Sequence, residues 1–166
     1  KTKEIIGKKR AVELVSMRDS IMAHPVAREL LTSEGVSELS VFSEIEGISV
    51  KCRPDRVCQK HGLLVDVKKT ADIETFERSA IKLRYYVQHA FYSDVCERAG
   101  IEFNGFVFIV VGEKKQIGRH PVEVVELSDS DVDRGRAEYI EDLEKYKDYI
   151  DFGVGIHARK VKLFNK

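Results

Sequence analysis

Hydrophobic and polar residues alternate along three short segments in the first half of the chain, and this period of two is typical of β-strands with one buried face. The three segments are residues 38–44, 48–55 and 62–68. Apolar residues recur at helical spacing in four other segments, which are residues 3–22, 25–31, 73–99 and 128–149. Two further strands are expected at residues 103–111 and 120–127. The order of these elements predicts an α/β fold.

The length and composition agree with a single domain that spans residues 1–166. A chain of 166 residues with 43% apolar residues can bury a substantial core, and no linker divides it. The sequence has no apolar run long enough to cross a membrane and no signal sequence at its start, which predicts a cytoplasmic protein. Cys52, Cys58 and Cys96 lack paired spacing, so they predict neither a disulfide framework nor a zinc site.

Two acids and a lysine stand toward the ends of the second and third predicted strands. Asp55 ends residues 48–55, and Asp66 and Lys68 share one face of residues 62–68, because side chains two apart in a strand point the same way. A polar turn at residues 56–61 would join the strands as a hairpin and bring the acids together. Two carboxylates and an ammonium group at one point can bind a divalent cation and a phosphate. The same spacing also fits a simple Lys–Asp ion pair on a solvated strand face.

An ordered series of motifs resembles the PD-(D/E)XK nuclease superfamily and, within it, the phage and prophage recombination exonucleases typified by exonuclease VIII. The matching segments are Pro54-Asp55, Asp66-Val67-Lys68 and the Gln-His-Ala-Phe-Tyr stretch at residues 88–92. The resemblance covers most of residues 1–127. It implies a restriction-endonuclease-like core, in which helices flank a central mixed sheet.

The resemblance also implies roles for individual residues. Asp55, Asp66 and the backbone carbonyl of Val67 would bind Mg²⁺ or Mn²⁺, since both ions prefer oxygen ligands. Lys68 would contact the scissile phosphate or orient the attacking water. Glu38 would stand near the metal, although a surface carboxylate beside a strand is the competing interpretation.

A polar face is expected on the helix that follows the third strand. Gln88 and Tyr92 are four residues apart and therefore share one face, to which Tyr85 also belongs. The resemblance makes Gln88 and Tyr92 part of the catalytic set and Tyr85 a DNA contact. The alternative is that all three side chains only pack the helix against the sheet.

Charge is balanced over the whole chain but segregated along it, with 28 basic and 28 acidic residues. Residues 129–151 are rich in acids, whereas a basic group surrounds the expected site and predicts contacts with DNA phosphates. This basic group consists of Lys51, Arg53, Arg56, Lys60, Lys68 and Lys69. The tail at residues 157–166 is basic again and would either touch phosphates or form a solvated end.

One element of the family has no counterpart in this sequence. Relatives in this branch carry a metal-binding histidine in an early helix, in a Gly-x-x-x-His setting, whereas His24 matches a downstream His-Pro element. We therefore expect the segment with the metal-binding histidine to lie upstream of residue 1. The other histidines of the chain are assigned no chemistry.

The resemblance implies an Mg²⁺-dependent exodeoxyribonuclease that degrades linear double-stranded DNA in the 5′ to 3′ direction and leaves 3′ single strands for recombination. It also implies a ring-shaped homo-oligomer and a single-strand annealing recombination protein as partner. Two other functions stay open: a structure-selective or restriction-type endonuclease, and a catalytically silent DNA-binding module. Cutting of closed circular DNA would indicate the endonuclease, and a lack of Asp66-dependent metal uptake would indicate the silent module.

Overall fold

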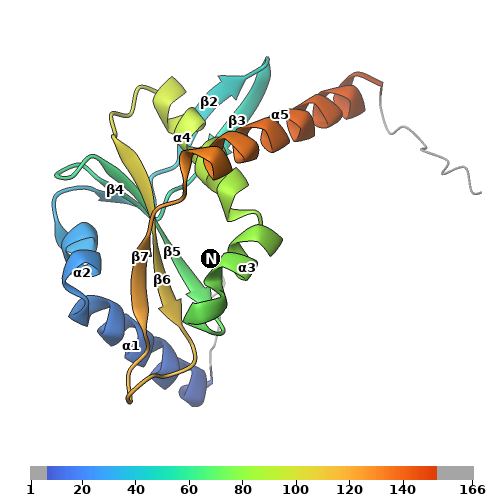
Figure 1. Ribbon diagram of the computed structural model, residues 1–166. Coiled ribbons are helices and arrows are strands. Elements are labelled where there is room, and N and C mark those ends of the chain that lie inside the picture. Colours follow the sequence, from blue (N-terminus) through green and yellow to red (C-terminus); the bar gives the residue numbers. More distant parts are fainter. Residues whose placement is uncertain (1–6, 153–166) are drawn as a thin grey trace, which may run out of the picture.

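The computed structural model describes residues 7–152, which form a five-stranded sheet, a separate two-stranded hairpin and helices on both faces of the sheet (Figure 1). The strands of the sheet follow the spatial order β1 (Val36–Ser37), β4 (Arg56–Cys58), β5 (Leu63–Thr70), β6 (Gly105–Gly112) and β7 (Val122–Val125). Strands β5 and β6 run parallel, and the other neighbours run antiparallel. The predicted α/β fold with a central mixed sheet is confirmed.

The separate hairpin consists of β2 (Val41–Ile45) and β3 (Ile48–Cys52). The expectation of one strand over residues 48–55 is wrong, because β3 ends at Cys52 and belongs with β2 to its own small sheet. Pro54 has no N–H group to donate to a strand ladder, and the chain leaves the hairpin there. The chain then enters the main sheet as β4, within the segment that was expected to be a polar turn.

The hairpin packs on helix α4 (Tyr85–Arg98), which lies on one face of the main sheet. Cys52 of β3 and Cys96 of α4 are both buried, and their Sγ atoms lie 3.7 Å apart. Cys58 is buried as well, and all three cysteines are free thiols. The cysteines therefore serve as small buried side chains.

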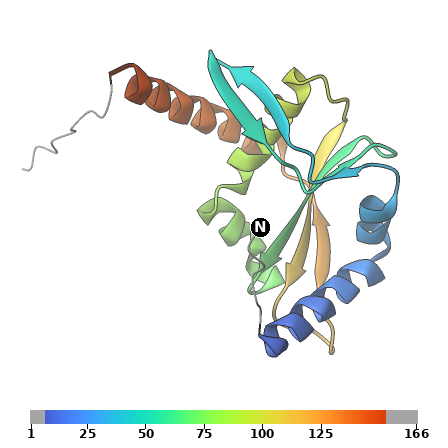
Figure 2. The ribbon, with the colours of Figure 1, turned by 180° about the vertical axis from the view of Figure 1, so that it is seen from behind.

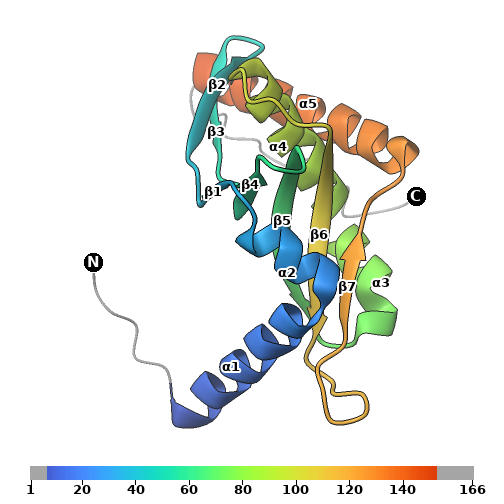
Figure 3. The ribbon, with the colours of Figure 1, turned by 90° about the vertical axis from the view of Figure 1, so that its left-hand side faces the viewer.

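Helices α1 (Lys8–Ala23) and α2 (Pro25–Thr32) cover one face of the sheet (Figure 3). Their buried residues pack against Val65 of β5 and against β6. Pro25 begins α2 as predicted, and the ring of His24 accepts a hydrogen bond from the backbone N–H of Ala27 at 3.2 Å. His24 therefore caps the start of α2, because it satisfies a backbone donor that has no partner inside the helix.

The opposite face of the sheet packs against η1 (Ile73–Thr75), α3 (Phe76–Lys82), α4 and α5 (Asp129–Phe152) (Figure 2). The expectation of one helix over residues 73–99 is wrong, because the helix is interrupted between α3 and α4. At the interruption Arg84 has a left-handed backbone conformation with a φ of 56°. Its guanidinium forms ion pairs with Glu138 and Asp142 of α5, which help to fix the change of direction.

The last predicted elements agree with the structure. Strand β7 lies within its expected segment, and β6 overlaps its own but ends one residue later, at Gly112. Ser128 caps α5 by accepting a hydrogen bond from the backbone N–H of Asp131 at 3.3 Å. Among residues 7–152, no helix combines the length and the hydrophobicity needed to cross a bilayer. The basic tail at residues 157–166 and the first residues of the expected N-terminal helix lie outside the described residues.

Candidate active site

Strand β5 carries a buried carboxylate on one face of the sheet. Asp66 and Lys68 lie on the face covered by α3 and α4, whereas Val65 lies on the face covered by α1 and α2. Asp66 is only 4% exposed, which is unusual for a carboxylate and requires compensating contacts. On this face of β5, the burial of the Asp66 carboxylate lowers the stability of the fold unless other groups compensate for it.

Asp55 reaches the same place from the neighbouring strand. It directly precedes β4, whose Arg56 pairs with Val65 of β5, so the antiparallel register sets Asp55 opposite Asp66. The backbone N–H of Val67 donates a hydrogen bond to Asp55 Oδ2 at 2.7 Å. The two acids converge as expected, although Asp55 precedes a strand of the main sheet and does not end the preceding one.

Two side chains contact the Asp66 carboxylate directly. Lys68 Nζ lies 2.7 Å from Oδ2, and Gln88 Nε2 donates a hydrogen bond to Oδ1 at 2.7 Å. Burial raises the pKa of Asp66 above its ordinary value, and the charge of Asp55 raises it further, whereas Lys68 and Gln88 act in the opposite direction. The site thus holds a carboxylate whose charge is costly without a nearby cation.

The polar face of α4 lies over this carboxylate. The ammonium group of Lys68 lies 4.5 Å from the centre of the Tyr85 ring, which places the cation over the aromatic face. Burial, and after it the negative charge of Asp66, raises the pKa of both Tyr85 and Tyr92. The three side chains expected on one face of α4 therefore lie at Asp66 and also pack against the sheet. No sequence pattern foretold the contact between Lys68 and Tyr85.

The donor set at this point fits a divalent cation with oxygen ligands. Asp66 Oδ2 is buried and forms an ion pair with Lys68, but it accepts no hydrogen bond of good geometry. It therefore has the capacity to bind a cation. Asp55 supplies a second carboxylate beside it, and such donors suit Mg²⁺ or Mn²⁺. No group of three or more His, Cys, Asp or Glu side chains is close enough to bind a metal ion within residues 7–152. A metal here would need backbone oxygen, water or phosphate as further ligands.

Glu38 lies next to Asp55 through its backbone but directs its carboxylate elsewhere. The Glu38 N–H donates a hydrogen bond to the carbonyl of Asp55 at 3.0 Å. Its carboxylate forms an ion pair with Arg53, with Arg53 Nε 2.9 Å from Oε2. Both side chains are more than half exposed, so the structure gives Glu38 the contacts of a surface carboxylate.

The basic group expected around the site is divided by the fold. Lys51 is exposed on β3, whereas Lys69 on β5 forms an ion pair with Glu113. The Arg56 guanidinium donates hydrogen bonds to the carbonyls of Leu30 and Ser33, at the end of α2. Consecutive side chains point to opposite faces of a sheet, and Asp55 lies on the same face as Asp66. The hydrogen bonds of Arg56 therefore lie on the other face.

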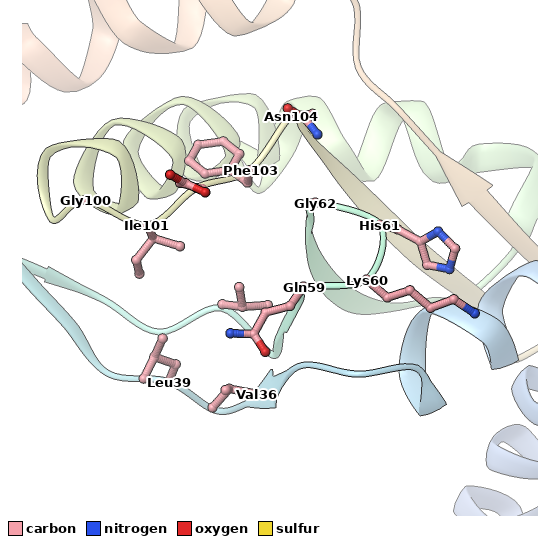
Figure 4. A pocket seen from close by; sticks show the side chains of 12 residues that line it. Val36, Leu39, Gln59, Lys60, His61, Gly62, Gly100, Ile101, Phe103 and Asn104 are labelled. Atoms are coloured by element: carbon pink, nitrogen blue, oxygen red, sulfur yellow. The ribbon is translucent and has the colours of Figure 1, made fainter.

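Lys60 and a nearby cavity lie at the far end of β5. Lys60 belongs to the β4–β5 turn, where its Nζ lies 2.6 Å from Glu29 Oε1. The turn and the loop before β6 enclose a cavity of about 730 Å³, with Lys60 and Phe103 in its wall (Figure 4). Asp66 is four residues beyond Gly62 of this wall, or roughly 13 Å at the rise of a strand. The expectation that Lys60 surrounds the acidic pair is therefore wrong.

The fold and the arrangement of Asp55, Asp66 and Lys68 define a nuclease-like domain of the PD-(D/E)XK type. Residues 1–153 match the family described as "PDDEXK-like domain of unknown function (DUF3799)". The chain belongs to this PDDEXK-like family, in agreement with the resemblance found in the sequence. A search of curated proteins finds no match.

One solved structure supports the same fold. A crystal structure described as "Putative exonuclease" from Eubacterium rectale matches 99% of this chain with a TM-score of 0.75 and 14% sequence identity. This chain spans 66% of the length of that structure. A phage related exonuclease from Haemophilus somnus 129PT matches 91% of this chain and 76% of its own, with a TM-score of 0.48 and 16% identity. The first of these likenesses confirms the fold.

Proposed function

We propose that this chain is a metal-dependent deoxyribonuclease, and that it degrades linear double-stranded DNA from the 5′ end and leaves 3′ single strands. One observation carries the proposal: Asp55 and Asp66 converge from neighbouring strands beside Lys68, on the polar face of α4. A phosphodiester is anionic, so its hydrolysis requires cationic stabilisation and an activated water. These groups match that requirement.

Each charged residue has a proposed role. Asp55 and Asp66, with the carbonyl of Val67, would hold Mg²⁺ or Mn²⁺; a bound ion supplies a Lewis acid and lowers the pKa of its water. The Lys68 ammonium lies against Asp66 Oδ2, so a cation bound to that oxygen would compete with it. Lys68 would then be free to pair with the scissile phosphate.

The residues of α4 orient these groups. Gln88 fixes the Asp66 carboxylate through its hydrogen bond to Oδ1, which leaves Oδ2 for a cation. The ring of Tyr85 lies over Lys68 and restricts the positions of the ammonium group. Tyr92 is half-buried near Gln88 and would contact the DNA strand together with Tyr85.

The proposal includes partners that follow from the family resemblance. The exposed cations Lys51, Arg53 and Lys69 would contact DNA phosphates, whereas the bonds of Arg56 to α2 leave it a structural role. A ring-shaped homo-oligomer around the DNA would keep the enzyme on its substrate between cuts, in the cytoplasm. A single-strand annealing protein would receive the 3′ strands for recombination.

The test is hydrolysis of linear duplex DNA labelled at one end. With Mg²⁺ or Mn²⁺, the wild-type protein should release nucleotides from the 5′ ends, and a chelator should stop the reaction. Asp55→Ala, Asp66→Ala and Lys68→Ala should each abolish hydrolysis, while DNA binding largely survives, because phosphate affinity is spread over several cations. Asp19→Ala is the matched control, because Asp19 is an exposed acid on α1 that pairs with Arg18.

Two results would contradict the proposal. Equal activity in the wild type and in the Asp66→Ala variant would remove Asp66 from the reaction. Cutting of closed circular DNA would favour an endonuclease, since an exonuclease requires an end. Calorimetry of Mg²⁺ or Mn²⁺ uptake, compared between the wild type and Asp66→Ala, separates both nucleases from a silent DNA-binding module.

A further inference from the structure

The connection between β6 and β7 forms a narrow β-hairpin that projects from the end of the sheet (Figure 3). We call residues 113–119 the prong. Gln116 and Arg119 pair across it through two backbone hydrogen bonds of 2.8 and 3.0 Å. Ile117 and Gly118 form the two-residue tip.

The base of the prong is bonded to the segment that continues β5. The backbone N–H of Glu113 donates to the carbonyl of Thr70 at 2.8 Å, and the N–H of Lys114 donates to the carbonyl of Ala71 at 3.1 Å. These bonds extend the pairing of β5 with β6 beyond the regular strands. The direction of the prong is therefore fixed relative to the strand that carries Asp66.

Two ion pairs strengthen the same base. Lys69 pairs with Glu113, and Lys114 Nζ lies 2.8 Å from Asp72 Oδ2. Both pairs join the start of the prong to residues at or just after the end of β5. The charges at the base are thus matched within the protein, whereas those nearer the tip are not.

The tip combines two features that are unfavourable for folding. Ile117 is fully exposed, at 104% of the reference area, and has a φ of 49°. A β-branched residue is poorly suited to this left-handed conformation, and hairpins of this kind normally use Asn or Asp followed by Gly. Isoleucine gains no packing in return within the described residues. A strained and exposed apolar tip on a fixed base points to a contact outside the chain.

The charges of the prong indicate the nature of that contact. Lys115 and Arg119 flank the tip, and neither forms an ion pair within residues 7–152. A binding partner should therefore combine negative charge with a flat apolar surface. The end of a DNA duplex has both, because phosphates surround the exposed face of the last base pair.

The prong is also placed to serve the candidate active site. Strands β5 and β6 are parallel, and Asp66 lies beside Phe108 of β6. Ile117 follows Phe108 by nine residues, so the two residues are at most about 30 Å apart even if the chain between them is fully extended. Since the prong leaves the sheet at the end of β5 nearer to Lys68, a DNA strand held at the tip would have to extend roughly 30 Å or less to reach the acidic pair.

We propose that the prong separates the strands at the end of a DNA duplex. Ile117 inserts against the terminal base pair and displaces it from the stack, while Lys115 and Arg119 contact the phosphates of the two strands. One separated strand then extends to Asp55 and Asp66. The inference takes its substrate from the proposed function, but strand separation does not depend on hydrolysis and is tested without it.

The first test measures opening of the terminal base pair in the absence of cutting. The DNA is a blunt duplex with 2-aminopurine in its last pair, whose fluorescence rises when the base leaves the stack, and a chelator is present. Saturating wild-type protein should raise the fluorescence, and Ile117→Asn should remove this rise. Asn tolerates left-handed backbone, so this variant should be at least as resistant to thermal unfolding as the wild type.

The control for apolar surface is Val12→Asn, because Val12 is an exposed apolar residue, at 63%, on α1. This variant should give the full fluorescence rise. A full rise with Ile117→Asn would overturn the proposal. A loss of affinity by Ile117→Asn that is equal for blunt and for forked duplexes would also overturn it, because the tip would then only bind DNA.

The second test uses hydrolysis of blunt and forked ends. Ile117→Asn should slow degradation of blunt ends roughly tenfold and that of forked ends less than about twofold, because only the blunt end must be unstacked. The double change Lys115→Gln and Arg119→Gln should weaken binding to both substrates and lower the salt dependence by about two counterions. If the wild type cuts neither substrate, the proposed nuclease fails, whereas the fluorescence test still decides the prong.

Discussion

The two faces of strand β5 differ in what they bury. On one face Val65 packs among apolar side chains from α1, α2 and β6. On the other, Asp66 is buried almost as completely but among Lys68, Gln88 and the tyrosines of α4. The first face gains stability from burial, whereas the second loses some of it to desolvation of a charge.

The difference between the two faces of β5 indicates which of them is the candidate for catalysis. A carboxylate in the middle of a central strand gives little to stability, since its burial raises its pKa and its partners only partly offset that effect. Its neighbour Val65, one residue earlier, has no such cost. Substitutions on the two faces should therefore separate activity from stability.

The largest effect is expected for Asp66→Asn. The amide keeps the shape of the side chain and still accepts the hydrogen bond from Gln88, so the fold should persist. The loss of the negative charge should lower the rate of DNA hydrolysis by about 10³-fold or more, because the proposed metal ligand is lost. The measurement is the rate of nucleotide release together with the far-UV circular dichroism spectrum. If the variant is folded and has near-normal activity, Asp66 does not take part in hydrolysis and this face of β5 is not the active site.

A pH effect on stability is expected from His89, which lies on α4 beside Gln88. Burial, and to a smaller extent the charge of Arg136, lowers the pKa of His89 from 6.5 to about 4. The unfolded chain then takes up the proton first, so the stability present above pH 6.5 is lost as the pH falls toward 4. The loss is about 3 kcal/mol over that range.

The check is urea unfolding of the wild type and of His89→Phe between pH 4 and pH 7. Phenylalanine keeps the stacking of this side chain on Phe106, whose ring centre lies 4.6 Å away. The variant should show a smaller loss of unfolding free energy in acid than the wild type. Parallel curves for both proteins would mean that another group causes the pH dependence.

On the apolar face, Val65→Ala should lower the free energy of unfolding by about 2 kcal/mol, because it leaves a cavity in the core. The rate of hydrolysis per folded molecule should not change. Denaturant titration and the DNA assay, performed at the same temperature, measure the two quantities. A Val65→Ala protein with normal stability but poor activity would contradict the view that one face of β5 serves stability and the other serves activity.

A smaller effect is expected for Gln88→Ala, which removes the hydrogen bond to Asp66 Oδ1. We expect about a tenfold loss of activity or metal affinity, as is usual when a residue that orients a ligand is lost. Gln88→Glu serves as a second variant, because it places another charge beside Asp66 and should raise the pH at which the activity appears. An unaltered pH profile in that variant would indicate that Gln88 is only a packing residue.

The smallest effect is expected for Glu38→Ala. Its carboxylate pairs with Arg53 on the surface, and exposed ion pairs contribute less than about 1 kcal/mol. Mg²⁺ affinity, measured by calorimetry, should change less than about threefold. A loss as large as that of Asp66→Asn would place Glu38 among the metal ligands.

The sequence predicted the parts of the site that depend on local periodicity. Alternation placed Asp66 and Lys68 on one face of a strand, and helical spacing placed Gln88 and Tyr92 on one face of α4. The motif series also identified the family. The roles assigned to these residues stay predictions until the variants are measured.

The sequence did not predict what depends on partners far along the chain. The strand boundary before Asp55 was wrong, because alternation continues past Cys52 while the backbone pairing changes from β2 to β5. The break at Arg84 involves neither proline nor glycine, and the ion-pair partners of Arg84 lie on α5, more than 50 residues along the chain. The prong was missed as well; its signal in the sequence is Ile117-Gly118 between basic residues, which lacks the usual turn residues.

The left-handed residue between α3 and α4 has a consequence for how this scaffold tolerates change. In an unbroken helix, each inserted residue would rotate everything downstream by about 100°, and Gln88 would swing away from the sheet. Because the second helix starts afresh after Arg84, insertions or deletions in α3 leave the angular phase of Tyr85, Gln88 and Tyr92 unaltered. The orientation of these three side chains is thus set by α4 itself and not by the number of residues in α3.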